Sequence, residues 1–183
     1  MRIVAGTLKG RPIRTPPGLD TRPTSDRARQ AVFNILEHAP WSDGLAGKRV
    51  IDLFAGSGAM GLEALSRGAA ACLFVERSPA AAAVVRANVE ALGLAACARL
   101  LERDATRLGP AAEAFDLAFL DPPYRSGFGL PALEALRSGD WLAPGAITVL
   151  ETAADEPAPA PEGFEALDRR HYGAAAVSLL RLG

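Results

Sequence analysis

The fold of this chain is indicated most clearly by residues 49–61, which read RVIDLFAGSGAMG. Residues 49–54 form a short apolar run that is typical of a buried strand, and glycines follow it. Gly56, Gly58 and Gly61 match the spacing G-x-G-x-x-G, which is typical of a tight turn between a strand and a helix. Such a turn lets the backbone approach a ligand closely, so the segment predicts a ligand site at the start of a helix.

The alternation of strand and helix continues on both sides of this segment. Further strands are expected at residues 72–76, 98–103, 115–120 and 147–151. Helices are expected at residues 60–67, 79–92 and 130–137, and before Pro40 after a cap at Thr24 to Asp26. Near-continuous apolar strands alternating with helices predict an α/β fold, with a parallel sheet covered on both faces. Residues 164–170 and 174–180 predict an antiparallel hairpin that closes the sheet edge.

The N-terminal residues carry most of the positive charge. Residues 1–30 hold seven basic side chains and two acidic ones, a net charge of +5, whereas the whole chain has a net charge of −1. Extended pieces at residues 2–5 and 12–15, separated by glycines, predict a small basic β-hairpin. Such a segment favours a polyanionic partner, although a solvated arm without a partner is the alternative. We therefore expect a basic extension, residues 1–23, and an α/β domain, residues 24–183.

Length and composition exclude several classes of protein. The chain has 183 residues, of which 49% are hydrophobic and 22% charged, so it is expected to be globular rather than disordered or fibrous. No apolar run approaches the roughly 20 residues that span a bilayer, and the N-terminus lacks a signal-peptide core, so a cytoplasmic protein is expected. Cys72 and Cys97 have no metal-ligand spacing, which predicts reduced thiols and no metal.

Acidic residues around the glycines indicate which cofactor would bind. Glu76 follows Gly56 by twenty residues at the end of the next strand, where its carboxylate can accept from ribose hydroxyls. The glycines alone suit a nicotinamide dinucleotide or S-adenosylmethionine, but Asp52 would repel a pyrophosphate and suits an ammonium group. We therefore favour S-adenosylmethionine over a nicotinamide dinucleotide. A tight turn without a ligand is the other alternative, which the three glycines together with the correctly placed Glu76 disfavour. The expected cofactor residues are Asp52, Gly56, Gly58, Glu76, Arg77, Asp104 and Ala105. Asp104 either accepts from the adenine amine or caps a helix.

A second motif, DPPY at residues 121–124, directly follows the apolar run 115–120. Its two prolines stiffen the turn, so the Asp121 carboxylate and the Pro122 carbonyl can face one point as two acceptors. These suit the two N–H groups of a planar amine whose ring stacks on Tyr124. The bonds favour pyramidalisation of the amine and aim its lone pair at an electrophile. The alternative is a strand that merely ends at prolines, with Tyr124 on the surface.

These motifs resemble those of a known family. DLFAGSG at residues 52–58 resembles the cofactor motif of class I S-adenosylmethionine methyltransferases, and DPPY resembles the motif of their amino-nitrogen branch. RIVAG at 2–6, LKGR at 8–11 and RPTSDRAR at 22–29 are similar to the bacterial 16S rRNA guanine-N2 methyltransferases of the RsmD type. The resemblance implies a Rossmann-like seven-stranded fold, S-adenosylmethionine as cofactor and S-adenosylhomocysteine as product. It implies as target the guanine-966 site of 16S rRNA, in the small subunit or a late assembly intermediate.

The resemblance also implies roles for individual residues. Asp121, Pro122 and Tyr124 would perform catalysis in a monomer. Substrate contacts are expected from Arg2, Lys9, Arg11, Arg14, Arg22 and Pro123. Arg22 could instead face the cofactor carboxylate.

Several other functions would use some of the same residues. A DNA adenine-N6 methyltransferase shares the DPPY motif but needs more sequence to read base edges. A protein-glutamine methyltransferase typically begins that motif with Asn. A dinucleotide-binding oxidoreductase leaves DPPY unexplained, and a pure RNA-binding module leaves the glycine turn unexplained.

Overall fold

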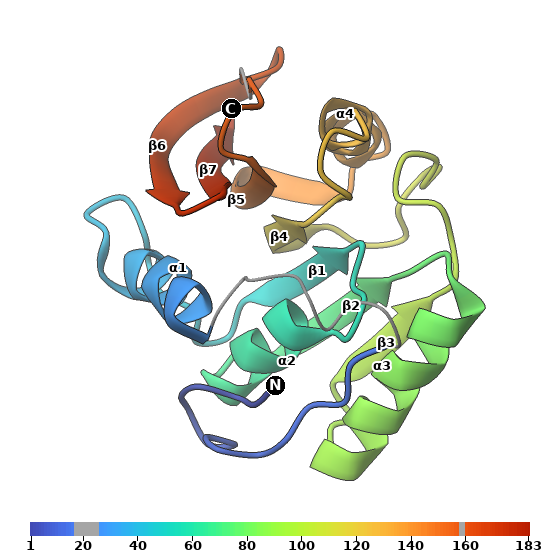
Figure 1. Ribbon diagram of the computed structural model, residues 1–183. Helices are drawn as coiled ribbons and strands as arrows, with labels where there is room; N and C mark the ends of the chain where they lie inside the picture. The colour runs from blue at the N-terminus through green and yellow to red at the C-terminus, as the bar shows by residue number, and fades with distance from the viewer. Residues whose placement is uncertain (17–25, 158–159) are drawn as a thin grey trace.

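The computed structural model describes residues 1–16, 26–157 and 160–183. The strands are β1 (Arg49–Leu53), β2 (Ala71–Val75), β3 (Ala98–Leu101), β4 (Phe115–Leu120), β5 (Leu142–Ala153), β6 (Phe164–Tyr172) and β7 (Ala175–Leu182). They form one seven-stranded sheet in the order β3-β2-β1-β4-β5-β7-β6 (Figure 1). The strands β1 to β5 are parallel, and β7 is antiparallel to both β5 and β6. This arrangement confirms the predicted α/β fold and the closing hairpin.

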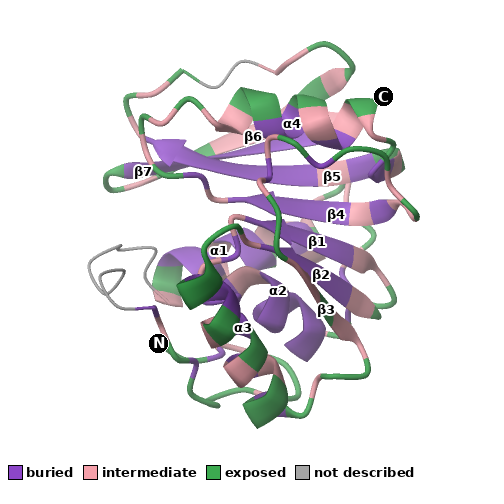
Figure 2. Cartoon of the chain, turned by 90° about the vertical axis from the view of Figure 1, so that its right-hand side faces the viewer, coloured by how far each residue is buried: buried purple, intermediate pink, exposed green. Residues whose placement is uncertain are grey.

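Helices cover both faces of the sheet. They are α1 (Asp26–His38), α2 (Ala59–Ser66), α3 (Pro79–Leu92) and α4 (Gly129–Ser138). Apolar side chains of α1, α2 and α3 share one core with Val50 of β1, whereas those of α4 share a second core with Ile51. Successive residues of a strand point to opposite faces, and because helices cover both faces, Val50 and Ile51 are both fully buried. Figure 2 shows the central strands buried over most of their length. The near-continuous apolar strands of the sequence follow from this double burial.

Strand β5 is longer than the sequence indicates. The prediction covered residues 147–151, but the strand begins at Leu142, which pairs with Phe115, and continues to Ala153, which pairs with Ala175. Residues 143–145 read APG and have low strand propensity, and the register with β4 shifts across them, from Phe115 paired with Leu142 to Leu117 paired with Ile147. Among the described residues, no helix has the length and apolar character needed to cross a membrane.

The N-terminal segment folds back on itself: Arg2 and Pro12 form an isolated antiparallel bridge, and the N–H groups of Ile3 and Ile13 donate to the carbonyls of Arg11 and Met1 at 3.0 Å. The segment is also bonded to α2, because the N–H of Thr7 donates to the carbonyl of Ser66 at 2.8 Å. A Cβ atom on Gly6 would lie 1.9 Å from that carbonyl oxygen, so the close approach requires glycine. Buried Ile3 belongs to the core beneath α1 to α3, as do other apolar residues of this segment. The proposed boundary at residue 23 lies outside the described residues.

Candidate functional site

Strand β1 places a buried carboxylate near its end against the first turn of α2. Asp52 is 3% exposed, and its Oδ2 accepts a hydrogen bond from the backbone N–H of Gly61 at 2.9 Å. A Cβ atom on Gly61 would lie 2.4 Å from Phe74 Cε1 and 2.5 Å from Cys72 Sγ. The third glycine of the motif therefore permits close packing of α2 on β2, and Gly58, with a φ of 79°, turns the chain into that helix.

Burial raises the pKa of Asp52 to about 8, mainly because the charged carboxylate loses hydration. The negative charges of Asp121 and Glu76 raise this pKa further, while the Gly61 N–H lowers it. Asp52 lies inside β1, next to its last residue, whereas Asp121 and Glu76 directly follow the neighbouring strands β4 and β2. A cationic group bound among them would favour the ionised form of Asp52.

Glu76 follows β2 and holds the glycine turn in place. Its Oε2 accepts from the N–H of Gly56 at 2.9 Å, and its Oε1 accepts from the N–H of Ser78 at 2.8 Å. A carboxylate has about four acceptor positions, so both bonds orient the side chain while it can still accept from a hydroxyl. The predicted contact with a ribose stays a prediction. The structure adds that Glu76 supports the turn itself.

A first pocket lies at the carboxyl ends of β1, β2 and β4. Its lining residues are Phe54, Gly56, Val75, Glu76, Arg77, Arg103, Ala105, Asp121 and Pro123. The pocket thus gathers four residues predicted for the cofactor, namely Gly56, Glu76, Arg77 and Ala105. Open α/β sheets bind ligands in this position, outside the carboxyl ends of the strands.

Asp104 is not among the lining residues of the first pocket. Its Oδ1 accepts from the backbone N–H and the hydroxyl of Thr106 at 2.9 and 2.8 Å, and these bonds lower the pKa of Asp104. Its Oδ2 lies 3.6 Å from Nη1 of Arg77. The side chain is therefore occupied by a local turn, and its contact with an adenine stays a prediction.

A second pocket adjoins the first. Its lining residues are Met1, Thr15, Pro16, Arg29, Asp52, Phe54, Ala55, Gly56, Ser57, Ala59, Met60, Asp121 and Glu151. Phe54, Gly56 and Asp121 line both pockets, so the two meet beside Asp121. An extended ligand lying across the glycine turn would reach from Glu76 toward Asp52. Within residues 1–16, 26–157 and 160–183, no group of three or more His, Cys, Asp or Glu side chains is placed to hold a metal ion.

The DPPY turn begins directly after β4. Pro122 is buried and Tyr124 is half-buried, and the Tyr124 hydroxyl donates to Oε1 of Glu151 at 2.7 Å. The pairing of Leu120 with Leu150 places Asp121 and Glu151 at the same level of the neighbouring strands. Asp121 therefore has a second carboxylate beside it, which no sequence motif indicates.

Phe54 lines both pockets and has an unusual backbone. Its φ of 59° lies in the left-handed region, which is rare for an aromatic residue and is often found at functional sites. Its ring stacks on that of Phe128, with centroids 6.5 Å apart, and the guanidinium of Arg77 lies 5.3 Å from the centre of the Phe128 ring. Phe54 belongs to the glycine motif of the sequence, but no role was predicted for it, and Phe128 was missed. Neither backbone strain nor this pairing has a sequence signal.

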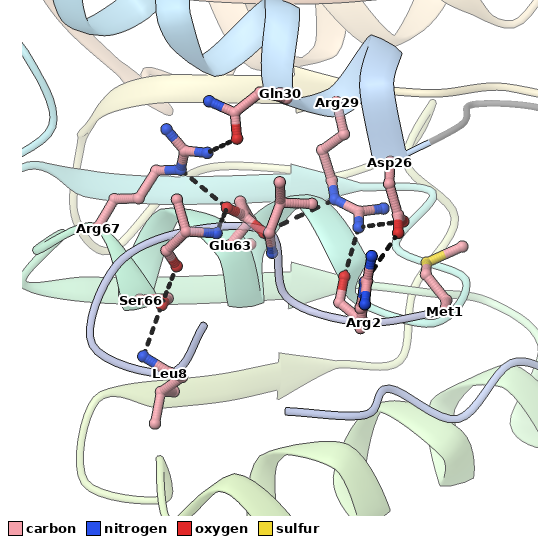
Figure 3. A network of polar contacts seen from close by, with 12 residues as sticks. Met1, Arg2, Leu8, Asp26, Arg29, Gln30, Glu63, Ser66 and Arg67 are labelled. Carbon is pink, nitrogen blue, oxygen red and sulfur yellow. Dashed lines mark hydrogen bonds and ion pairs between the residues drawn. The ribbon is translucent and has the colours of Figure 1, made fainter. Parts of the chain in front are cut away.

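A buried ion-pair network attaches the N-terminal segment to α1 and α2 (Figure 3). Fully buried Glu63 accepts from the backbone N–H of Val4 at 2.7 Å and of Ala5 at 2.9 Å. Arg67 Nε donates to Glu63 at 2.8 Å, and Arg29 Nε lies 3.7 Å from the same carboxylate. Because this network fixes the N-terminal segment against the helices, Met1, Thr15 and Pro16 of that segment can line the second pocket.

Most of the basic residues expected to contact substrate lie on the outside of this segment. The exposed side chains are those of Arg2, Lys9, Arg11 and Arg14. Arg2 lies 3.4 Å from Asp26, and Arg11 donates to the carbonyl of Ala91 at 2.8 Å. Arg22 lies outside the described residues.

Arg29 differs from these exposed side chains. It was counted with the basic charge of residues 1–30, but it is 1% exposed and donates to Asp26 at 2.9 Å. The periodic burial of α1 directs it inward. The segment thus exposes fewer positive charges than its sequence contains.

Comparison with known proteins identifies the family. Residues 1–181 match a family model described as Conserved hypothetical protein 95. Ribosomal RNA small subunit methyltransferase D of Haemophilus influenzae is 32% identical over 185 residues, which cover 98% of this chain and 92% of that protein. The Bacillus subtilis protein YlbH is 42% identical over 129 residues, or 68% of this chain and 67% of that protein. The solved structure of yhhF from Escherichia coli has a TM-score of 0.84 and 33% identity, covering 100% of this chain and 97% of that chain. The chain therefore belongs to the family described as Conserved hypothetical protein 95, the RsmD family of methyltransferases.

Proposed function

We propose that the chain transfers a methyl group from S-adenosylmethionine to the exocyclic N2 amine of one guanine in 16S rRNA, the guanine-966 site. The observation that carries this proposal is the position of Asp121, which lines both pockets. A methyl donor on the glycine turn and an amine beside the DPPY turn would meet there. A small-subunit rRNA substrate is supported by the name of the Haemophilus influenzae relative.

The residues of the glycine turn fit the proposed cofactor. Asp52 is buried close to Asp121 and Glu76, so an ammonium group bound among these carboxylates would favour its ionised form, and Glu76 stands at the turn where a ribose would lie. S-adenosylmethionine, when bound, supplies an electrophilic methyl group on a sulfonium. The acidic surroundings of Asp52 favour such a cationic ligand over a pyrophosphate.

The DPPY turn would prepare the amine. The Asp121 carboxylate and the Pro122 carbonyl are the two acceptors for its N–H groups, and the buried position of Pro122 keeps that carbonyl in place. Two such bonds orient the nitrogen lone pair toward the glycine turn, and Asp121 can receive the proton that the amine loses on methylation. The Tyr124 ring offers a stacking face for the base.

The exposed basic residues would position the RNA. Phosphate contacts fix register and orientation but carry no sequence information. Lys9, Arg11 and Arg14 are exposed on the N-terminal segment, whose backbone is fixed to α2 by Glu63 and Ser66. RNA bound there would lie next to the second pocket, since Met1 of the same segment lines it.

The proposal is tested with Asp121→Ala and the control Asp43→Ala, whose exposed carboxylate pairs with Lys48 on another part of the surface. Asp121→Ala should lower turnover by about a hundredfold or more, as expected for loss of one preorganised polar group, with little change in cofactor affinity. The substrate is small subunits that lack the methyl group, and mass spectrometry of RNA nucleosides identifies the product. Normal turnover by Asp121→Ala, or methyl groups found on adenine instead of guanine N2, would contradict the proposal.

A further inference from the structure

Glu151 is a carboxylate that faces the second pocket from the strand next to the DPPY turn. It lies near the end of β5 and is 7% exposed, yet it lines the same pocket as Asp52 and Asp121. The pairing of Leu120 with Leu150 sets Glu151 level with Asp121 across neighbouring strands, whose backbones lie about 4.8 Å apart. A flat base with its amine at Asp121 would therefore present the adjoining part of its edge to Glu151.

Tyr124 orients this carboxylate. Its hydroxyl donates to Glu151 Oε1 at 2.7 Å, so the turn that offers a stacking face also fixes the acceptor on β5. An ionised carboxylate can only accept hydrogen bonds. The group beside the target amine must therefore be a donor.

We infer that Glu151 is a specificity residue that accepts a hydrogen bond from the N1–H of the target guanine. This inference rests on the proposed function. On guanine the N2 amine is flanked by the donor N1–H, whereas the N6 amine of adenine and the N4 amine of cytosine are flanked by ring nitrogens that only accept. A carboxylate that faces one of those nitrogens can form no hydrogen bond with it, because both groups are acceptors. Sites built around such a hydrogen bond reject an analogue that cannot form it far more strongly than sites built on shape alone.

The test compares two bases that both carry a 2-amino group. Small-subunit rRNA is rebuilt by ligation with either guanine or 2,6-diaminopurine at the methylated position, because diaminopurine keeps the amine but has an accepting N1. The wild-type protein should prefer guanine in kcat/KM by at least about a hundredfold. Glu151→Gln, whose amide can also donate, should narrow this ratio by at least about tenfold. Glu165→Gln, an exposed change near Arg181 on the edge hairpin, should leave the ratio unchanged.

The outcomes separate this inference from the proposed function. If Glu151→Gln lowers kcat/KM equally for guanine and diaminopurine, so that their ratio stays at the wild-type value, Glu151 gives only structural support. This result would overturn the inference but not the proposed function. Tyr124→Phe keeps the ring and should narrow the ratio in the same direction, so the inference stays testable if Glu151→Gln does not fold. A wild-type protein that leaves the guanine N2 unmethylated would overturn both the inference and the proposed function.

Discussion

Replacing Glu63 by Gln should destabilise the protein strongly, because Glu63 is the shared partner of two buried arginines. The side chains of Arg29 and Arg67 are 2% and 3% exposed, and Glu63 is fully buried. Breaking a buried ion pair from one side costs about 3 to 5 kcal/mol. We expect about 3 kcal/mol for Glu63→Gln, because Arg29 keeps Asp26, Arg67 keeps Glu37 and the glutamine retains one acceptor oxygen.

Urea denaturation measures this destabilisation directly. With a slope of about 2 kcal/mol per molar urea, the unfolding midpoint should fall by about 1.5 M. Amide exchange at Val4 and Ala5 should accelerate, since their N–H groups donate to Glu63. The matched control is Glu134→Gln, which breaks an exposed pair with Arg137 and should cost less than about 1 kcal/mol. Equal midpoints for the two variants, together with unchanged exchange at both amides, would refute the role of the network.

Three further predictions concern the site and the basic surface. The pKa of Asp52 is raised from 3.8 to about 8 on folding, so the folded state binds a proton that the unfolded state has lost, and stability falls as pH rises from about 4 to about 8. Asp52→Asn should remove this pH dependence. In urea denaturation, the stability of the variant relative to the wild type should therefore increase between pH 5 and pH 8. Glu76→Ala should weaken S-adenosylmethionine binding in calorimetry by roughly ten- to a hundredfold, and an unchanged dissociation constant would remove Glu76 from the site. The combined change of Lys9, Arg11 and Arg14 to Ala should leave cofactor binding normal. The slope of log affinity for RNA against log salt concentration should become shallower by about 0.7 to 0.9 for each phosphate that is no longer neutralised. An unaltered slope would exclude these residues from phosphate binding.

The sequence predicts the sheet domain well because its signals are local. The run 49–54 followed by glycines indicates β1 and the start of α2, and Pro79 and Gly93 bracket α3 closely. The full extent of β5 was missed, because it depends on pairing partners far along the chain. Element type is thus set by local pattern, while element length is set by tertiary contacts.

The site was predicted less completely. Motif spacing identified Asp52, Glu76 and Asp121, of which Asp52 lines the second pocket, Glu76 the first, and Asp121 both. Glu151 was missed because a lone glutamate at a strand end has no motif around it, and only the register with β4 places it beside Asp121. Arg29 was counted in the positive charge of residues 1–30, although its position on α1 turns it toward Glu63.

The left-handed backbone of Phe54 has a consequence for protein engineering. A φ of 59° costs a bulky residue on the order of 1 kcal/mol or more, and glycine or asparagine would adopt it with less strain. The ring, however, stacks on Phe128 and packs against the core that α4 shares, and losing this packing costs more than the strain. Libraries screened at position 54 for heat resistance and for turnover should therefore both keep an aromatic side chain, even though the backbone there suits glycine or asparagine.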